Sequence, residues 1–226
     1  MSTTKAPNLV ARRTFLLAAA ALSTQLIRTP MAKAETVKKP VNLNKKVNLD
    51  HFIADCIEAN NEADAQMAVR EVLAKAVSKP GALLNALGEP DKAGIQILHQ
   101  SAALTIFNAM WTPQMNLLPH NHLMWANIGI YTGREDNILW RKNEHTIEAY
   151  GAEALFEGDV GTLGHDIVHS VTNPLLRFTG GIHIYGGDFF HTTRSEWDPE
   201  TLDERPSDGQ AIQAMFAAEN ERRAKK

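Results

Sequence analysis

The chain after about residue 93 is a succession of short β-rich runs separated by turn residues. Each run is enriched in β-branched and aromatic residues, and glycine or Asn-Pro stands between several of them. The runs are Leu104–Trp111, Trp125–Tyr131, Ile138–Arg141, Thr146–Tyr150, Ala154–Phe156, Asp166–Val171, Leu176–Phe178 and Ile182–Tyr185. Many short strands of this kind are typical of a sandwich or a closed barrel, so we predict a mainly β fold.

The segment before it, residues 49–92, has the apolar spacing of helices. Polar residues suited to N-caps precede two of the expected helices, and Gly88 ends the third. The predicted helices are Asp50 to about Asn60, Asn61 or Glu62 to Ala76, and Lys79–Gly88. We expect them to pack on a barrel of residues 93–200, followed by a polar tail or helix over residues 201–226.

The first 34 residues show the features of an export signal in order. Arg12 and Arg13 form a twin-arginine pair, an apolar run covers Leu17–Ile27, and Ala32–Ala34 offers small residues for cleavage. This run is shorter than the ~20 residues of a membrane span. The sequence therefore predicts export to or beyond the periplasm through the twin-arginine machinery, a linker over residues 35–48, and no membrane span in the mature chain.

Charge and cysteine content narrow the classes of function. The net charge is −3, and the signal segment holds five basic and no acidic residues, so the mature chain of 192 residues would carry −8. An acidic chain is a poor partner for nucleic acid or an anionic membrane. The single cysteine, Cys56, excludes an intramolecular disulfide, and its amphipathic surroundings predict a buried side chain. We expect a single domain whose stability comes from an apolar core.

His120-Asn121-His122 is the strongest functional signal in the β-rich part. On an extended segment, residues i and i+2 point to the same face and lie roughly 6.5–7 Å apart. Both imidazoles can therefore bind one metal ion, an arrangement that a helix does not allow at this spacing.

Other histidines differ in what their neighbours imply. His165 and His169 would share one face of a helix, but their segment is β-branched and ends in Asn-Pro. On a strand these positions lie about 13 Å apart, so only one can join a given ion, and we predict His169. His183 and Tyr185 alternate with isoleucines and share the polar face of another strand. The histidines predicted to be structural are His51, His99, His145 and His191.

Three groups of residues together resemble the motifs of a known family. They are Trp111, Pro119-His-Asn-His122 and Gly133; Asp166-Ile-Val-His169 with Asn173; and His183-Ile-Tyr-Gly-Gly187. In order and spacing they resemble the cupins, and among these most closely the cysteine dioxygenase-type thiol dioxygenases, over roughly Gly94–Phe190. The resemblance implies a cupin double-stranded β-helix barrel behind an N-terminal helical segment.

The resemblance also implies the metal ligands. His120, His122 and His169 would bind the ion, Fe(II) above all, with zinc, manganese or nickel as alternatives. Common cupins add a glutamate four or five residues after the second histidine, where this chain has Ala126 and Asn127. The site would therefore have no carboxylate ligand, as in thiol dioxygenases.

Roles beside the metal follow from the same resemblance. Tyr185 would hydrogen-bond the bound substrate or oxygen, and His183 would orient it. Family members often carry a serine two residues before that histidine, but Gly181 stands here, so the relay is incomplete. The cysteine–tyrosine crosslink of some members cannot form, because Cys56 lies in the helical segment. An upstream arginine that holds a substrate carboxylate in some members aligns with Gln96, which becomes the predicted substrate-binding residue.

The expected activity is the oxidation of a small thiol by O2 to a sulfinate, because three neutral imidazoles leave neighbouring positions on one ion for both reactants. Two alternatives stay open. One is a zinc or manganese cupin that acts as a lyase, isomerase or hydrolase through a bound water. The other is a non-catalytic periplasmic cupin that binds a metal or a ligand. Export after folding would let the metal load before the chain meets competing zinc or copper.

Overall fold

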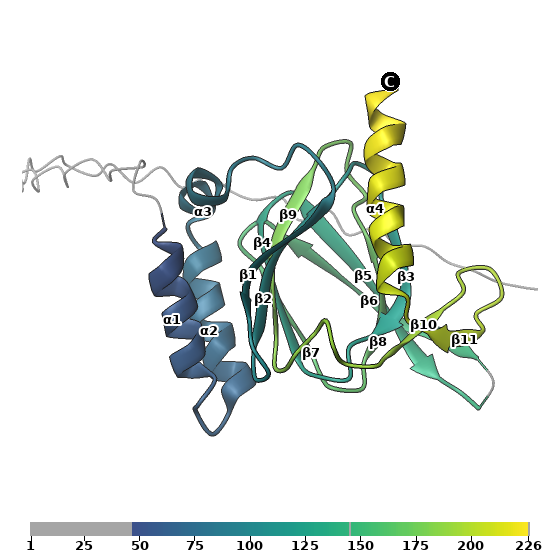
Figure 1. Cartoon of the computed structure of the whole chain (residues 1–226), viewed down its shortest axis with the longest axis horizontal. Helices are drawn as coiled ribbons and strands as arrows, with labels where there is room; N and C mark the ends of the chain where they lie inside the picture. Colours follow the sequence, from purple (N-terminus) through teal and green to yellow (C-terminus); the bar gives the residue numbers. More distant parts are fainter. Residues whose placement is uncertain (1–46, 145, 226) are drawn as a thin grey trace, which may run out of the picture. The chain divides into compact units, whose positions relative to one another are not determined.

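The computed structural model of the protein describes residues 47–144 and 146–225. The predicted signal segment, most of the predicted linker and His145 lie outside the described residues. The strands form a five-stranded and a six-stranded antiparallel sheet (Figure 1). In spatial order, the first contains β1 (Gly94–Gln100), β2 (Thr105–Trp111), β9 (Thr179–Tyr185), β4 (Ala126–Thr132) and β7 (Val160–Leu163). The second contains β11 (Glu204–Pro206), β10 (Ser195–Trp197), β3 (Asn116–Asn121), β8 (Val168–Thr172), β5 (Arg134–Lys142) and β6 (Ile147–Phe156).

The strand order identifies the architecture. From β2 to β9, consecutive strands alternate between the two sheets except at the β5–β6 hairpin, and they give the orders β2-β9-β4-β7 and β3-β8-β5-β6. This is the jelly-roll arrangement of two interleaved Greek keys, the double-stranded β-helix of cupins. The predicted mainly β cupin barrel is thus confirmed. The turn from β4 to β5 uses Gly133 at φ +85°, where a Cβ would collide with the backbone of Thr179.

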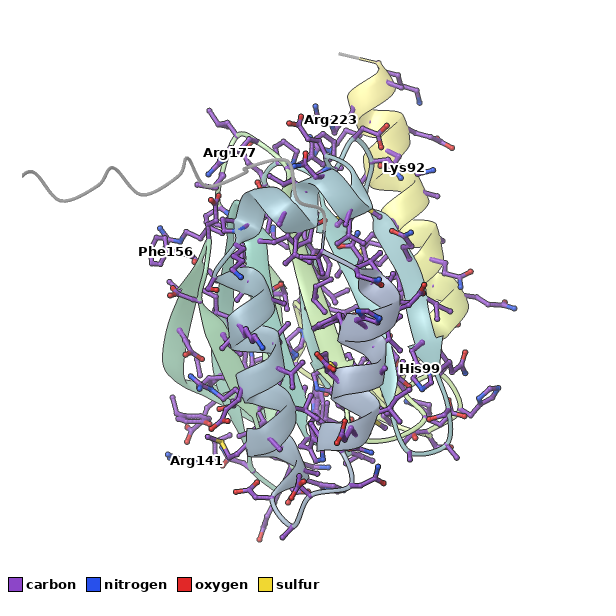
Figure 2. The ribbon with its side chains drawn as sticks, turned by 90° about the vertical axis from the view of Figure 1, so that its left-hand side faces the viewer. Lys92, His99, Arg141, Phe156, Arg177 and Arg223 are labelled. Atoms are coloured by element: carbon purple, nitrogen blue, oxygen red, sulfur yellow. The ribbon has the colours of Figure 1, made fainter. Side chains whose placement is uncertain are left out.

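Helices cover the outer face of the five-stranded sheet. They are α1 (Leu49–Ala59), α2 (Ala65–Val77) and α3 (Pro80–Leu87), and Figure 2 looks directly onto α1 and α2 with the strands behind. Their apolar faces meet Ile106, Ile182 and Ile184, so β2, β9 and β4 are buried on both faces. Cys56 is fully buried in the same layer, as predicted, and burial raises the pKa of its thiol to about 12.

Several boundaries differ from the prediction for local reasons. The first two helices begin after the side-chain caps Asn48 and Asp64, because those carboxamide and carboxylate oxygens accept hydrogen bonds from the backbone N–H groups three residues on. Two expected strands join into β6, since a register irregularity opposite Leu139 and Trp140 lets the strand continue through Gly151. The predicted strand Leu176–Phe178 is wrong, because residues 175–177 form a bend in which Asn173 Nδ2 donates to the carbonyl oxygen of Arg177 at 2.9 Å.

The C-terminal segment forms one long helix, α4 (Gly209–Ala224), capped by Asp208. It packs beside the barrel near β1 (Figure 1), and its Phe216 stacks on Trp111 with ring centroids 5.5 Å apart. The segment predicted as a polar tail or helix is therefore a helix, and it contributes to the core. Among the residues that the structure describes, no helix combines the length and the apolar composition needed to cross a bilayer.

Candidate metal centre

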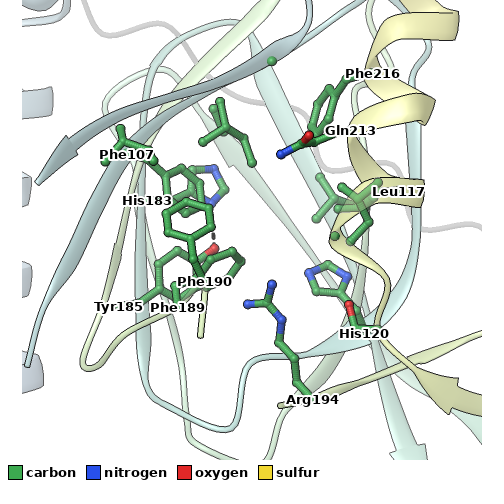
Figure 3. Close-up of a pocket in the computed structure, with 18 of the residues that line it drawn as sticks. Phe107, Leu117, His120, His183, Tyr185, Phe189, Phe190, Arg194, Gln213 and Phe216 are labelled. Atoms are coloured by element: carbon green, nitrogen blue, oxygen red, sulfur yellow. Dashed lines mark hydrogen bonds between the residues drawn. The ribbon is translucent and has the colours of Figure 1, made fainter. Parts of the chain in front are cut away.

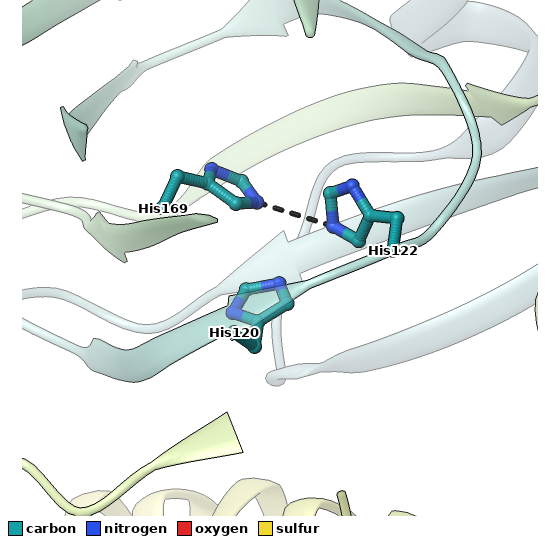
Figure 4. A group of neighbouring side chains, drawn as sticks. All are labelled: His120, His122 and His169. Atoms are coloured by element: carbon teal, nitrogen blue, oxygen red, sulfur yellow. Dashed lines mark hydrogen bonds between the residues drawn. The ribbon is translucent and has the colours of Figure 1, made fainter. Parts of the chain in front are cut away.

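The structure brings His120, His122 and His169 together inside the barrel. His120 lies on β3 directly opposite His169 on β8, and His122 follows β3 by one residue. One ring nitrogen from each histidine lies within 4.8 Å of the others, and all three side chains are buried (Figure 4). The cluster is the set that the sequence predicted as metal ligands.

Hydrogen bonds to the outer ring nitrogens orient two of these imidazoles. His120 Nδ1 donates to the carbonyl oxygen of Leu118 at 2.9 Å, and His169 Nδ1 donates to Asn137 Oδ1 at 2.6 Å. Their Nε2 atoms are therefore unprotonated and point into the cluster. His169 Nε2 lies 3.1 Å from His122 Nε2. At this distance the lone pairs of two unprotonated ring nitrogens repel each other. A proton shared between the two nitrogens, or a metal cation bound by both, removes that repulsion.

Burial keeps the cluster neutral. It lowers the pKa of His120 to about 4 and holds the pKa values of His122 and His169 well below their usual range, with the neighbouring imidazoles adding to the effect. Neutral imidazole is the form that binds a metal.

The donor set fits a metal ion. Three uncharged nitrogen donors converge, and two of them belong to rings whose outer Nδ1 already donates a hydrogen bond, as is usual for metal-binding histidines. Imidazole suits zinc, iron, copper and nickel alike. The centre is therefore a candidate metal site, and the residues that would coordinate the ion are His120, His122 and His169.

A cavity of about 300 Å³ opens beside the cluster (Figure 3). Its walls are mostly apolar side chains from the barrel and from α4, a lining typical of small-molecule sites. The apolar walls include Phe107, Leu117, Phe189, Phe190, Ile212 and Phe216. The polar groups that reach it include His120, His169, His183, Tyr185, Arg194 and Gln213.

Arg194 is the cation of this cavity. Its guanidinium points into the space between Tyr185 and His120 (Figure 3) and stacks 3.7 Å above the centre of the Phe189 ring. Nη1 is buried and has no hydrogen-bond partner, and burial lowers the pKa of the side chain. A buried guanidinium nitrogen without a hydrogen-bond partner costs free energy, and a bound anion would remove that cost.

Tyr185 and His183 share the inner face of β9, as predicted. His183 Nδ1 lies 3.3 Å from Tyr185 Oη, and the Tyr185 ring lies 4.8 Å from the His122 ring. Burial raises the pKa of Tyr185, so the phenol stays protonated beside the metal centre.

A buried carboxylate that the sequence reasoning missed lies behind this pair. Glu135 Oε2 accepts a hydrogen bond from Trp111 Nε1 at 3.0 Å, and Oε1 accepts one from Asn137 Nδ2 at 3.2 Å. His183 Nε2 lies 3.3 Å from Oε2, within ion-pair distance but out of line for a hydrogen bond. The sequence signal that could have indicated Glu135 was the Glu-x-Asn spacing after Gly133, which places two polar residues on the same face of a strand. Arg194 follows the last barrel strand and belongs to no motif.

The remaining predicted residues lie elsewhere. Gln96 is on the outward face of β1, where Asn108 Nδ2 donates to its Oε1 at 3.4 Å, while Ile95 and Ile97 face the cavity. The structure therefore does not bring Gln96 to the cavity. His165 is exposed and pairs with the adjacent Asp166. None of the described histidines predicted to be structural, His51, His99 and His191, joins the cluster.

No protein-family model matches the sequence, and no curated protein matches it. An RmlC-like cupin family protein with a double-stranded β-helix fold from Methanocaldococcus jannaschii aligns over 45% of this chain and 85% of its own, with 10% identity and a TM-score of 0.39. KdgF from Halomonas sp. aligns over 41% and 76%, with 15% identity and a TM-score of 0.34. An oxalate decarboxylase variant from Bacillus subtilis aligns over 45% and 27%, with 15% identity and a TM-score of 0.36. The similarity to these three proteins concerns the fold alone. The fold itself is assigned from the strand order described above.

Proposed function

We propose that this protein is a metal-dependent dioxygenase, with Fe(II), that oxidises the thiol of a small carboxylic acid to a sulfinate. Both atoms of O2 join the sulfur, so that RSH and O2 give RSO2H and no other reductant is consumed. The observation that carries the proposal is the presence of Arg194, a cation whose buried Nη1 has no hydrogen-bond partner, in the same small cavity as the carboxylate-free cluster of imidazoles.

The ion that His120, His122 and His169 would hold supplies neighbouring positions at which sulfur and O2 can meet. The protein's own part is positioning. Arg194 offers N–H donors of fixed geometry, which suit the two oxygens of a carboxylate. The Phe189 ring under the guanidinium holds its plane in place. A short acid bound there would have its other end directed along the cavity toward His120.

The Tyr185 hydroxyl is the hydrogen-bond donor beside the histidine cluster. Its raised pKa keeps the hydroxyl available as a donor to a bound anion, and the His183 contact limits its rotation. The surrounding phenylalanines exclude water, which strengthens both this hydrogen bond and the ion pair expected at Arg194.

A zinc or manganese enzyme that activates water is less well supported. That chemistry commonly uses a carboxylate as general base, and among the described residues no aspartate or glutamate lines the cavity. Glu135 is turned toward His183, Trp111 and Asn137 instead. A non-catalytic binding protein would share the cavity and the cation, and the test must therefore measure turnover.

The test is O2 uptake by the iron-loaded protein with a matched series of thiols: a short mercapto acid, its methyl ester, an aminothiol and an alkanethiol. We expect one O2 consumed per mercapto acid, a sulfinate product by mass spectrometry, and at least tenfold lower turnover with the ester. Arg194→Met should raise KM for the acid and remove the preference over the ester. Uptake at background with every thiol would overturn the proposal, and binding of the acid without turnover would support a binding protein.

We also propose that the chain is exported by the twin-arginine route after folding with its metal. The twin-arginine pair, the apolar run Leu17–Ile27 and the small residues of Ala32–Ala34 support this placement. Replacing Arg12 and Arg13 together by lysine should leave the protein in the cytoplasmic fraction with an uncleaved N-terminus. Unchanged export of that variant would contradict the proposed route.

A further inference from the structure

We propose that Glu135 is the positioning residue of this centre, a buried anion that holds His183 in one tautomer and orients Asn137 behind a metal ligand. The inference deepens the proposed function, because it concerns the hydroxyl that faces the substrate. The inference rests on the contacts that Glu135 on β5 makes with Trp111 on β2, Asn137 on β5 and His183 on β9.

Glu135 is completely buried, and its environment is built for the ionised form. Burial alone would raise its pKa, but the nearby His183 imidazole and the hydrogen bonds from Asn137 and Trp111 outweigh burial, so that the pKa is lowered. A buried carboxylate without such partners would neutralise or destabilise the fold. The three partners come from three different strands, so the carboxylate also ties the two sheets together.

The first consequence concerns His183. An ionised carboxylate only accepts protons, so the ring nitrogen facing it, Nε2, carries the hydrogen. In the neutral ring Nδ1 is then an acceptor, and it lies 3.3 Å from Tyr185 Oη. A Cβ built on Gly181 would lie 3.4 Å from His183 Nε2. Glu135 thus supplies from β5 the partner that the glycine at position 181 cannot offer.

The second consequence concerns Asn137. Because Glu135 Oε1 is an acceptor, the Nδ2 group of Asn137 must face it, and Oδ1 must turn the other way. That oxygen accepts the hydrogen bond from His169 Nδ1 at 2.6 Å, which leaves His169 Nε2 free for the metal. One carboxylate therefore sets the orientation of two groups, His183 and Asn137.

The decisive variant is Glu135→Gln, which keeps the shape and removes the charge. Asp136→Asn is its matched control, because Asp136 is the adjacent residue on β5, points outward and pairs with Arg134 at 2.6 Å. The first readout is the histidine side-chain ¹⁵N spectrum of the zinc-loaded full chain. We expect a single His183 tautomer protonated at Nε2 in the parent and in Asp136→Asn, and a mixture of tautomers in Glu135→Gln.

The second readout is zinc affinity, measured by competition with a chromophoric chelator. Glu135→Gln and Asn137→Ala should each weaken binding by roughly 10–100-fold, as outer partners of metal ligands do, while Asp136→Asn should not. Asn137→Ala should leave the His183 spectrum unchanged, which separates the two consequences. Glu135→Asp keeps the anion and should retain the single tautomer, so it tests the inference if the glutamine variant does not fold.

An unchanged His183 spectrum in Glu135→Gln, or equal changes in Asp136→Asn, would overturn the inference. A mixed tautomer in Glu135→Asp would overturn it as well, because the charge would then not be the cause. None of these measurements needs a thiol. Failure of O2 uptake would therefore reject the proposed function while leaving this inference standing, and the reverse outcome is equally distinguishable.

Discussion

His120 and His169 are register partners in the β3–β8 ladder, and their ring centroids lie 4.6 Å apart. Directly opposite residues of an antiparallel pair have Cβ atoms about 4.5–5.5 Å apart on the same face. The backbone ladder therefore sets the separation of two ligands. The third, His122, reaches the same point through its i, i+2 relation to His120.

This arrangement predicts that each ligand is needed for metal binding. We expect His122→Ala to lower metal affinity by more than about 100-fold, a larger loss than outer partners of ligands produce. Metal content after dialysis and competition titration would measure it. His165→Ala is the matched control, because His165 is exposed on a turn and paired only with Asp166. A His122→Ala protein that binds metal like the parent would show that the ligand assignment is wrong.

The buried imidazoles predict that the metal-free protein loses stability in acid. Burial lowers the pKa of His120 from its ordinary value of 6.5 to about 4 in the folded protein. The unfolded chain therefore takes up its proton first as the pH falls, so stability is full above about pH 6.5 and declines toward pH 4. The lowered pKa values of His122 and His169 act in the same direction. His120 alone accounts for about 3 kcal/mol.

Urea unfolding of the metal-free protein at several pH values would measure this decline. His120→Asn should reduce the decline of unfolding free energy with falling pH, because the variant lacks the buried imidazole that takes up a proton only on unfolding. Unfolding free energy that is constant from pH 7 to pH 4, or that rises, would contradict the burial of neutral imidazoles.

The three-histidine cluster could be predicted from the sequence because its signals are local. The i, i+2 spacing places His120 and His122 on one face, and the β-branched surroundings of His169 exclude the helical alternative. Most barrel strands were predictable for the same reason, since alternation and turn residues are read within a few positions. The short strands β10 and β11, of three residues each, are too short for such a pattern.

Local sequence patterns do not show which side chains the folded barrel brings to the cavity, as three residues illustrate: Glu135, Arg194 and Gln96. Glu135 meets His183 only because two sheets close on each other, and Arg194 reaches the cavity through the chain that follows β9. Gln96 was predicted from an alignment, but alternation along β1 turns it outward while Ile95 and Ile97 face inward. Which face of a strand is inside depends on register with β2, which the sequence does not show.

The contact between α4 and the barrel predicts a large cost for Phe216→Ala. Phe216 is buried and stacks on Trp111, whose indole N–H donates to Glu135. We expect a loss of about 3–5 kcal/mol in unfolding free energy from the cavity and the lost packing. Phe216→Leu fills most of the space and should cost less than half as much. Equal, small losses in both variants by urea unfolding would show that α4 does not hold the wall of the cavity.

The packing of α2 on β4 predicts that a side chain added at Gly129 destabilises the fold by overpacking. A Cβ there would lie 2.8 Å from Leu73 Cγ and 2.8 Å from Val77 Cγ1, so α2 rests directly on the glycine. Gly129→Ala should therefore lower unfolding free energy by about 1–3 kcal/mol through overpacking. Gly151→Ala on β6 is the control, because its Cβ would meet Leu139 Cδ1 at an ordinary 3.8 Å. If the two alanine variants unfold at the same urea concentration, α2 does not lie against β4 as closely as this contact requires.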